Sequence, residues 1–98
     1  MDHLGFEWDE GKNTLNKRKH GISFEEGITA FADDNGLLLP DPDHSTEEDR
    51  FILMGFSSSL RILVVCHCYR RGGEIIRIIS ARKATKPERV DYTKRWKK

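Results

Sequence analysis

The segment 74–89, EIIRIISARKATKPER, places arginines in an unusual setting. It begins as an apolar strand in which Arg77 stands among four isoleucines, and it enters a helix at Thr85. A buried guanidinium is costly unless it is paired, so Arg77 needs either an acid on a neighbouring element or an anionic ligand. Arg82 follows near the strand end, and the alternation of side chains along a strand predicts that positions 77 and 82 lie on opposite sides. The planar fork of arginine suits phosphate, and the sequence leaves both roles open.

Further bases and hydroxyls, near strand ends and on the first helix, are the set that metal-independent RNA cleavage requires. In that reaction a base withdraws the 2′-OH proton, cationic groups hold the phosphate, and an acid protonates the leaving 5′-oxygen. We predict that Arg77 and Arg82 hold the phosphate and that His67 or Tyr92 moves a proton, with histidine the natural carrier near neutral pH. The residues expected to extend the RNA-binding surface are Lys12, Lys19, His20, Arg61 and Ser80.

Several of these residues have a purely structural alternative. His67 lies in a strand, where a histidine hydrogen-bonded within the sheet is equally consistent with the pattern. Tyr92 and Trp96 are four residues apart on the last helix, a spacing more typical of core residues than of base-stacking platforms. Arg61 shares the side of the strand on which His67 lies, but the two are ~20 Å apart when extended and cannot grip one phosphate.

A metal site is not predicted. The sequence contains no Gly-rich phosphate loop, no HExxH motif and no Ser-centred nucleophile elbow. One acidic stretch could in principle hold a divalent cation, but its spacing matches no calcium loop and such a turn is mostly solvated. Its residues are Asp41, Asp43, His44, Glu47, Glu48 and Asp49. The two cysteines, Cys66 and Cys68, are expected to be buried, reduced thiols, and no cofactor is predicted.

Length and composition limit the classes to which the protein can belong. The 98 residues allow one domain, spanning 1–98, with a modest core. The chain is 37% hydrophobic and 34% charged, without a run that approaches a membrane span or the apolar region of a signal peptide. These features predict a cytoplasmic protein with no membrane partner.

The formal net charge of +1 results from a cancellation. Residues 21–49 include nine acids and no Lys or Arg, whereas residues 50–98 include thirteen bases and three acids. This split predicts a basic surface for a polyanion and an acidic surface for a basic partner, unless the two halves neutralise each other in the fold.

Periodicity, caps and turn signals predict an α+β fold with two N-terminal helices, a small antiparallel sheet of three to four strands and a C-terminal helix. Two capping boxes, Ser23 with Glu26 and Thr85 with Glu88, are expected to begin the second and the last helix. The expected helices cover residues 10–19, 24–31 and the segment after 85, and the expected strands cover 37–39, 48–56, 60–69 and 74–81.

Two long blocks, KHGISFEE at 19–26 and RIISARKAT at 77–85, resemble the BrnT family of type II toxins, whose fold resembles that of RelE-type ribonucleases. Further residues that carry the resemblance are Phe6, Glu7, Trp8, Asp9, Phe31, Asp41, His44, Ser45, Glu48, Arg50, Gly55, Glu88, Arg89 and Tyr92. The resemblance implies a bacterial, ribosome-independent endoribonuclease that acts on RNA and arrests translation. It also implies a BrnA-like antitoxin with a ribbon-helix-helix part, and operator DNA contacted only through the toxin–antitoxin complex. We expect the antitoxin to cover the basic groove with an acidic or apolar segment.

Two other classes of protein are compatible with the same residues. A basic module that holds RNA or DNA without cutting it needs the arginines but no proton-transfer group, and its binding is sensitive to salt. An interaction protein would instead dock a basic partner on its acidic half, residues 21–49, and keep its basic half solvated.

Overall fold

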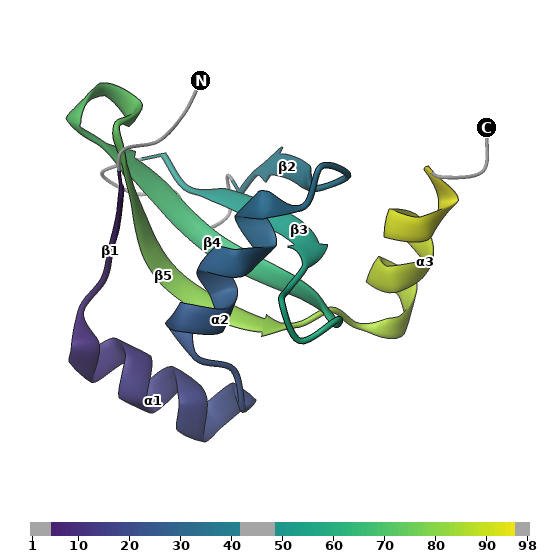
Figure 1. The fold of residues 1–98 in the computed structure, drawn as a ribbon, viewed down its shortest axis with the longest axis horizontal. Helices are drawn as coiled ribbons and strands as arrows, with labels where there is room; N and C mark the ends of the chain where they lie inside the picture. The colour runs from purple at the N-terminus through teal and green to yellow at the C-terminus, as the bar shows by residue number, and fades with distance from the viewer. Residues whose placement is uncertain (1–4, 42–48, 96–98) are drawn as a thin grey trace.

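A five-stranded sheet in the order β1-β5-β4-β3-β2 forms the centre of the computed structural model, which describes residues 5–41 and 49–95 (Figure 1). The strands are β1 (Gly5–Glu7), β2 (Leu37–Pro40), β3 (Phe51–Phe56), β4 (Ile62–Arg70) and β5 (Ile75–Lys83). The α+β class is confirmed. The prediction of a purely antiparallel sheet with three to four strands is wrong, because β1 pairs with β5 in parallel and adds a fifth strand. The three residues of β1 are too few to carry a strand signal of their own.

The pairing of β4 with β5 contains an irregularity that changes which side chains share a face. Between Cys66 and His67 of β4 the register shifts by one residue of β5, so β5 bulges around Ile79. An odd separation normally places Arg77 and Arg82 on opposite faces, but the extra residue reverses the alternation between them. Both arginines therefore lie on the same face of the sheet, and the sequence-based prediction about their faces is wrong.

Helix α1 (Glu10–His20) has the boundaries that its capping residues predict. The Asp9 side chain accepts a hydrogen bond from the Lys12 amide at the N-terminus. Gly21 ends the helix in the left-handed conformation, with φ 72°, which glycine adopts without the Cβ clash of other residues. The last turn carries Lys17, Arg18, Lys19 and His20, and cations are favoured there by the helix dipole.

Helix α1 is held against β5 by a buried amide. Asn16 Nδ2 donates to the Ala81 carbonyl at 2.7 Å and to the Ile22 carbonyl at 2.9 Å, while its Oδ1 accepts from the Ala81 amide at 3.2 Å. Beyond the short β1 strand, β5 would otherwise present these backbone groups as an open sheet edge. The Asn16 amide thus replaces a neighbouring strand and sets the position of α1.

Helix α2 (Phe24–Thr29) begins at Ser23, whose hydroxyl accepts from the Glu26 amide at 3.0 Å. The predicted reciprocal capping box is wrong at this position, because the Glu26 carboxylate pairs with Arg61 instead of the Ser23 amide. The 3-10 turn η1 (Ala30–Ala32) follows. At the last helix, α3 (Lys86–Lys94), the second capping box forms as predicted between Thr85 and Glu88.

The helices bury the two faces of the sheet unequally. The face under α2 is packed by the larger core cluster, which comprises Ile22, Phe24, Ala30, Leu53, Leu63, Val65, Ile76, Ile78 and Ala81. The other face has a smaller cluster near its end, where Tyr92 of α3 packs against Phe56 with ring centroids 5.7 Å apart. Figure 1 shows α2 in front of the sheet and α3 beyond the end of β3. None of the helices in the described ranges is long and apolar enough to cross a membrane.

Candidate nucleic-acid interface

A groove between α1 and β5, with a volume of about 230 Å³, brings predicted RNA-binding residues together. The residues that line this α1–β5 groove are Lys12, Leu15, Asn16, Lys19, His20, Ile79 and Ser80. Four of the five residues proposed to bind RNA thus share one surface, although they come from segments about 60 positions apart in the chain. Two ammonium groups, an imidazole and a hydroxyl at one groove are suited to holding phosphate and moving a proton.

One wall of the α1–β5 groove is positioned by the hydrogen bonds of Asn16, and the other by the bulge in β5. Lys12 and Lys19 lie two turns apart on α1, and Asn16 between them anchors the helix to β5. On the opposite wall, the β5 bulge brings the consecutive residues Ile79 and Ser80 to the same groove. Bulges often occur next to functional sites because they redirect side chains in this way.

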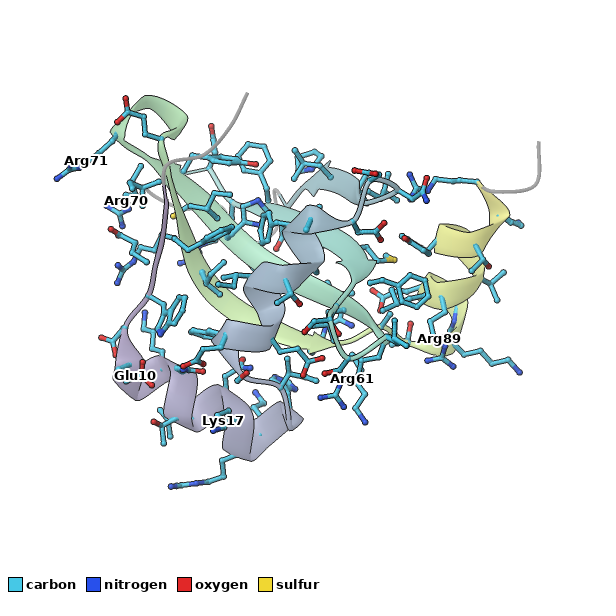
Figure 2. The ribbon with its side chains drawn as sticks, viewed as in Figure 1. Glu10, Lys17, Arg61, Arg70, Arg71 and Arg89 are labelled. Carbon is cyan, nitrogen blue, oxygen red and sulfur yellow. The ribbon has the colours of Figure 1, made fainter. Side chains whose placement is uncertain are left out.

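The fifth predicted RNA-binding residue, Arg61, lines a second cavity of about 270 Å³. This Arg61 cavity is lined by Phe56, Leu60, Arg61, Ile62, Lys83, Ala84 and Arg89. Figure 2 shows Arg61 and Arg89 at the same end of the molecule, beside the start of α3. Sequence reasoning missed Lys83 and Arg89 as cationic neighbours of Arg61. Only the excess of bases in the C-terminal half pointed toward them.

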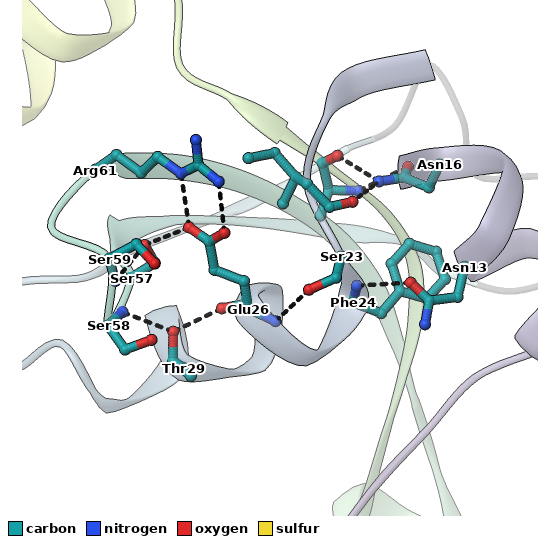
Figure 3. A network of polar contacts seen from close by, with 12 residues as sticks. Asn13, Asn16, Ser23, Phe24, Glu26, Thr29, Ser57, Ser58, Ser59 and Arg61 are labelled. Carbon is teal, nitrogen blue, oxygen red and sulfur yellow. Dashed lines mark hydrogen bonds and ion pairs between the residues drawn. The ribbon is translucent and has the colours of Figure 1, made fainter. Parts of the chain in front are cut away.

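A hydrogen-bonded network holds Arg61 in place (Figure 3). Arg61 donates through Nε and Nη2 to the two carboxylate oxygens of Glu26, at 2.8 and 2.7 Å. Ser57 Oγ donates to the same carboxylate at 2.7 Å, and the Ser58 amide donates to Thr29 Oγ1 at 2.8 Å. The hydrogen bonds from Arg61 lower the pKa of Glu26, and the same contact raises the pKa of Arg61. The loop between β3 and β4 is therefore fixed to α2.

Arg77 and Arg82 both have acidic partners. Arg77 Nη1 pairs with Glu7 of β1 at 2.9 Å. Arg82 makes a bidentate pair with Glu88 of α3, at 2.8 and 3.0 Å. Of the two roles that the sequence left open, the structure shows the ion pair at both positions. Their side chains keep 30% and 37% of their surface exposed, so both arginines are partly accessible to solvent.

The pairing of Glu88 predicts a pH-dependent contribution of this residue to stability. Hydrogen bonds from Arg82 lower its pKa from 4.5 to about 2. Because the folded-state pKa is depressed, the contribution is fully present above pH 4.5 and is lost as the pH falls toward about 2. We expect Glu88→Gln to lower the free energy of unfolding by about 1 kcal/mol near neutral pH, since solvent screens this partly exposed pair. The difference from the unmodified protein should shrink below pH 4.

Urea denaturation at several pH values measures this effect, with Glu74→Gln, an exposed carboxylate, as the control. A difference that stays constant from pH 7 to pH 2.5 would show that the pair does not titrate as described.

The two predicted proton carriers, His67 and Tyr92, lie in the protein interior. His67 is fully buried, with Nδ1 3.1 Å from the Val65 carbonyl, Nε2 3.3 Å from the Tyr69 hydroxyl and its ring 4.9 Å from that of Phe31. Tyr92 is also fully buried, and its hydroxyl donates to Asp33. Burial and this carboxylate raise the pKa of Tyr92. Both side chains occupy core positions, as in the structural alternatives given above for His67 and Tyr92. Neither side chain lines the α1–β5 groove.

The acidic stretch from Asp41 to Asp49 falls largely outside the described residues, which include only its two end members. Within residues 5–41 and 49–95, no group of three or more His, Cys, Asp or Glu side chains is arranged to hold a metal ion. Cys66 and Cys68 are both reduced thiols, with Cys68 buried and Cys66 partly exposed. Burial raises the pKa of the Cys66 thiol, which keeps it protonated.

Fold and surface together define a small α+β protein with two cationic cavities suited to a phosphate-bearing ligand. A family model described as "Ribonuclease toxin, BrnT, of type II toxin-antitoxin system" matches residues 8–88, and the chain belongs to this family. The solved structures include the 1.1 Å crystal structure of the Brucella abortus ribonuclease toxin, BrnT, which is 25% identical with a TM-score of 0.64. That match covers 85% of this chain and 99% of the Brucella chain. No sequence among the curated proteins matches.

The two sequence blocks that carry the resemblance to this family, 19–26 and 77–85, lie at the same groove. The block 19–26 begins with Lys19 and His20, and the block 77–85 includes Ser80. These residues face one another across the α1–β5 groove, and Asn16 joins the two blocks through its bonds to Ile22 and Ala81. This groove is therefore the candidate site for RNA.

Proposed function

We propose that the chain is a metal-independent endoribonuclease toxin that cleaves free RNA, without the ribosome, and so arrests translation. The observation that carries the proposal is the convergence of Lys12, Lys19, His20 and Ser80 on the α1–β5 groove. In a family of ribonuclease toxins, an accessible groove with cations and an imidazole is a better candidate site than the buried His67 and Tyr92.

The proposed reaction uses the side chains of the groove in the order that RNA cleavage requires. The His20 imidazole accepts the 2′-OH proton, and the 2′-oxygen attacks the phosphorus. Lys12 and Lys19 stabilise the charge that develops on the phosphate oxygens, and either ammonium group can protonate the leaving 5′-oxygen. Ser80 donates a hydrogen bond to the phosphate. The products are a 2′,3′-cyclic phosphate and a 5′-hydroxyl end.

Arg77 and Arg82 remain part of the proposal as outer phosphate contacts. Each keeps part of its side chain exposed while it is paired, which supports an approach of RNA that leaves the ion pair intact. Their role is therefore proposed to be in affinity, with the proton transfers assigned to the α1–β5 groove.

The proposed partner is a BrnA-like antitoxin whose acidic or apolar segment covers the groove, and which alone contacts operator DNA. The family assignment supports an antitoxin, because type II systems pair a toxin with a protein antitoxin. We also propose that the fold resembles that of RelE-type ribonucleases. This proposal rests on the α+β architecture and on the similarity to the Brucella toxin.

RNA cleavage by the purified chain, freed from antitoxin and assayed with a chelator, tests the proposed function. Cleavage that leaves 2′,3′-cyclic phosphate ends is expected, and activity that requires a divalent ion would contradict the proposal. Lys19→Ala should reduce kcat/KM by about tenfold or more, because a charge-assisted contact contributes roughly 1.5–3 kcal/mol.

The matched control for this substitution is Arg18→Ala. Arg18 is an exposed base on the same helical turn, and it does not line the α1–β5 groove. Equal losses in the two variants would indicate general electrostatic attraction and would remove Lys19 from the site.

A further inference from the structure

The Arg61 cavity has the features of a second binding site beside the α1–β5 groove. Its walls include three cationic side chains, Arg61, Lys83 and Arg89, around apolar groups from Phe56 and Leu60. Arg61 is occupied by Glu26, and Arg89 Nη1 donates to the Ala84 carbonyl at 2.9 Å. Lys83 is an exposed residue, and together with the hydrogen bonds from Arg61 its ammonium charge helps to lower the pKa of the Glu26 carboxylate.

The loop at the mouth of the cavity presents an apolar side chain to solvent. Leu60 is 82% exposed, the largest exposed fraction among the large hydrophobic side chains of the described residues. It also has a φ of 62°, in the left-handed region that residues with a Cβ rarely adopt. Strain of this kind persists where the surrounding structure enforces it, and it is concentrated at functional sites.

The surrounding contacts do enforce this conformation. The Leu60 amide donates to the Ser57 carbonyl at 2.9 Å, and the Ser57 amide donates to the Arg61 carbonyl at 2.9 Å. Ser57 and Ser58 are in turn fixed to α2 through Glu26 and Thr29. The backbone that carries Leu60 is thus held in place by a fixed loop before a ligand arrives.

We infer that the Arg61 cavity is a second RNA subsite, in which Lys83 contacts a phosphate and Leu60 packs against the base of an unpaired nucleotide that flanks the cleaved bond. The inference rests on the proposed ribonuclease function and adds to it a determinant of substrate length and affinity. Lys83 lies four residues beyond Ile79 on β5, which corresponds to about 13 Å along the strand. One short stretch of single-stranded RNA can therefore reach both the α1–β5 groove and this subsite.

The chemistry of the cavity favours a single-stranded nucleic acid over other anions. A free phosphate would use the cations but not the apolar groups, whereas a nucleotide uses both because every base has an apolar face. A paired base hides that face in its stack, so the subsite should accept unpaired RNA.

Two substitutions test the subsite in the full chain. Lys83→Ala should raise the KM for a single-stranded RNA that spans both sites by about tenfold, with kcat nearly unchanged. It should also reduce the slope of log affinity against log salt by about 1, as expected for one lost phosphate contact. Lys94→Ala, an exposed lysine of α3 outside the cavity, is the control and should change neither quantity.

Leu60→Gly separates a binding role from a structural one. Glycine adopts a positive φ without strain, so this variant should be at least as stable as the unmodified protein. It should nevertheless bind the same RNA roughly fivefold more weakly, because the apolar contact is lost. Leu60→Asn, which also tolerates this backbone conformation, should show the same loss.

RNA binding measured in the His20→Ala background separates failure of this inference from failure of the proposed function. If that protein binds RNA and the Lys83 and Leu60 substitutions do not change affinity or salt dependence, the subsite is refuted while the groove stands. If neither His20→Ala nor the unmodified chain binds or cleaves any RNA, the proposed function itself fails. Substitutions that weaken only antitoxin binding would assign the cavity to a protein partner and overturn the inference.

Discussion

His20→Ala is expected to lower kcat for RNA cleavage by roughly 10²- to 10⁴-fold, the usual contribution of a general acid or base. The fold should be retained, because the His20 side chain is partly exposed at the end of α1 and lines the α1–β5 groove. RNA affinity should change little, because Lys12 and Lys19 remain. Single-turnover cleavage and binding measured on the same RNA give the two quantities separately.

A second histidine substitution provides the sharpest comparison. His67→Gln changes the residue that the sequence favoured as proton carrier, but its site is fully buried among aromatic rings. We expect this variant, where folded, to keep its cleavage rate within a fewfold range, with its main effect on stability. Loss of activity in folded His67→Gln together with full activity in His20→Ala would reverse the assignment.

The pH dependence of the reaction distinguishes proton transfer from positioning. His20→Gln keeps a hydrogen-bonding side chain of similar size but cannot exchange a proton near neutral pH. It should be as inactive as His20→Ala and should lose the limb of the pH–rate profile that belongs to the base. Recovery of activity in His20→Gln would indicate that His20 only positions the RNA.

Asn16→Ala should lower the free energy of unfolding by about 3 kcal/mol or more. The substitution leaves the buried amide and carbonyl of Ala81 and the carbonyl of Ile22 without their partner, and each unsatisfied group costs about 1–3 kcal/mol. For a chain of this size, the loss corresponds to a decrease in Tm of about 10–20 °C. Thermal and urea denaturation measure it directly.

The same substitution should also weaken RNA binding, because Asn16 sets the distance between the two walls of the α1–β5 groove. Asn35→Ala, an exposed asparagine in the turn before β2, is the control for the loss of an amide and should be nearly neutral. If Asn16→Ala is as stable as this control, the amide does not anchor α1 to β5.

The residues of the proposed RNA site could be selected from the sequence, but their grouping could not. Residue type alone pointed to Lys12, Lys19, His20 and Ser80, because each carries a cation, an imidazole or a hydroxyl. Their common location depends on the packing of α1 against β5, which rests on one buried asparagine that has no distinctive sequence signal. The burial of His67 could not be predicted for the same reason, because it depends on which face of the sheet α2 and η1 cover.

Capping shows where local information is sufficient. Asp9, Gly21 and the pair Thr85 with Glu88 act within one helical turn, so the sequence determines the helix ends that they form. Glu26 has the same spacing from Ser23, yet its carboxylate pairs with Arg61, which lies 35 residues away. A charged partner brought close by the fold forms a stronger hydrogen bond than a local amide does.

The sequence by itself determined the α+β class, the starts of the helices and the hairpin strands, and it singled out the side chains that we propose bind RNA. These features depend on hydrophobic period, caps and turns, which involve residues close together in the chain. Only the tertiary structure decided the parallel β1 strand, the β5 bulge that places Arg77 and Arg82 on one face, and the burial of His67 and Tyr92. Each of these depends on backbone pairing or packing between segments far apart in sequence, where many registers satisfy the local pattern and the packed core selects one.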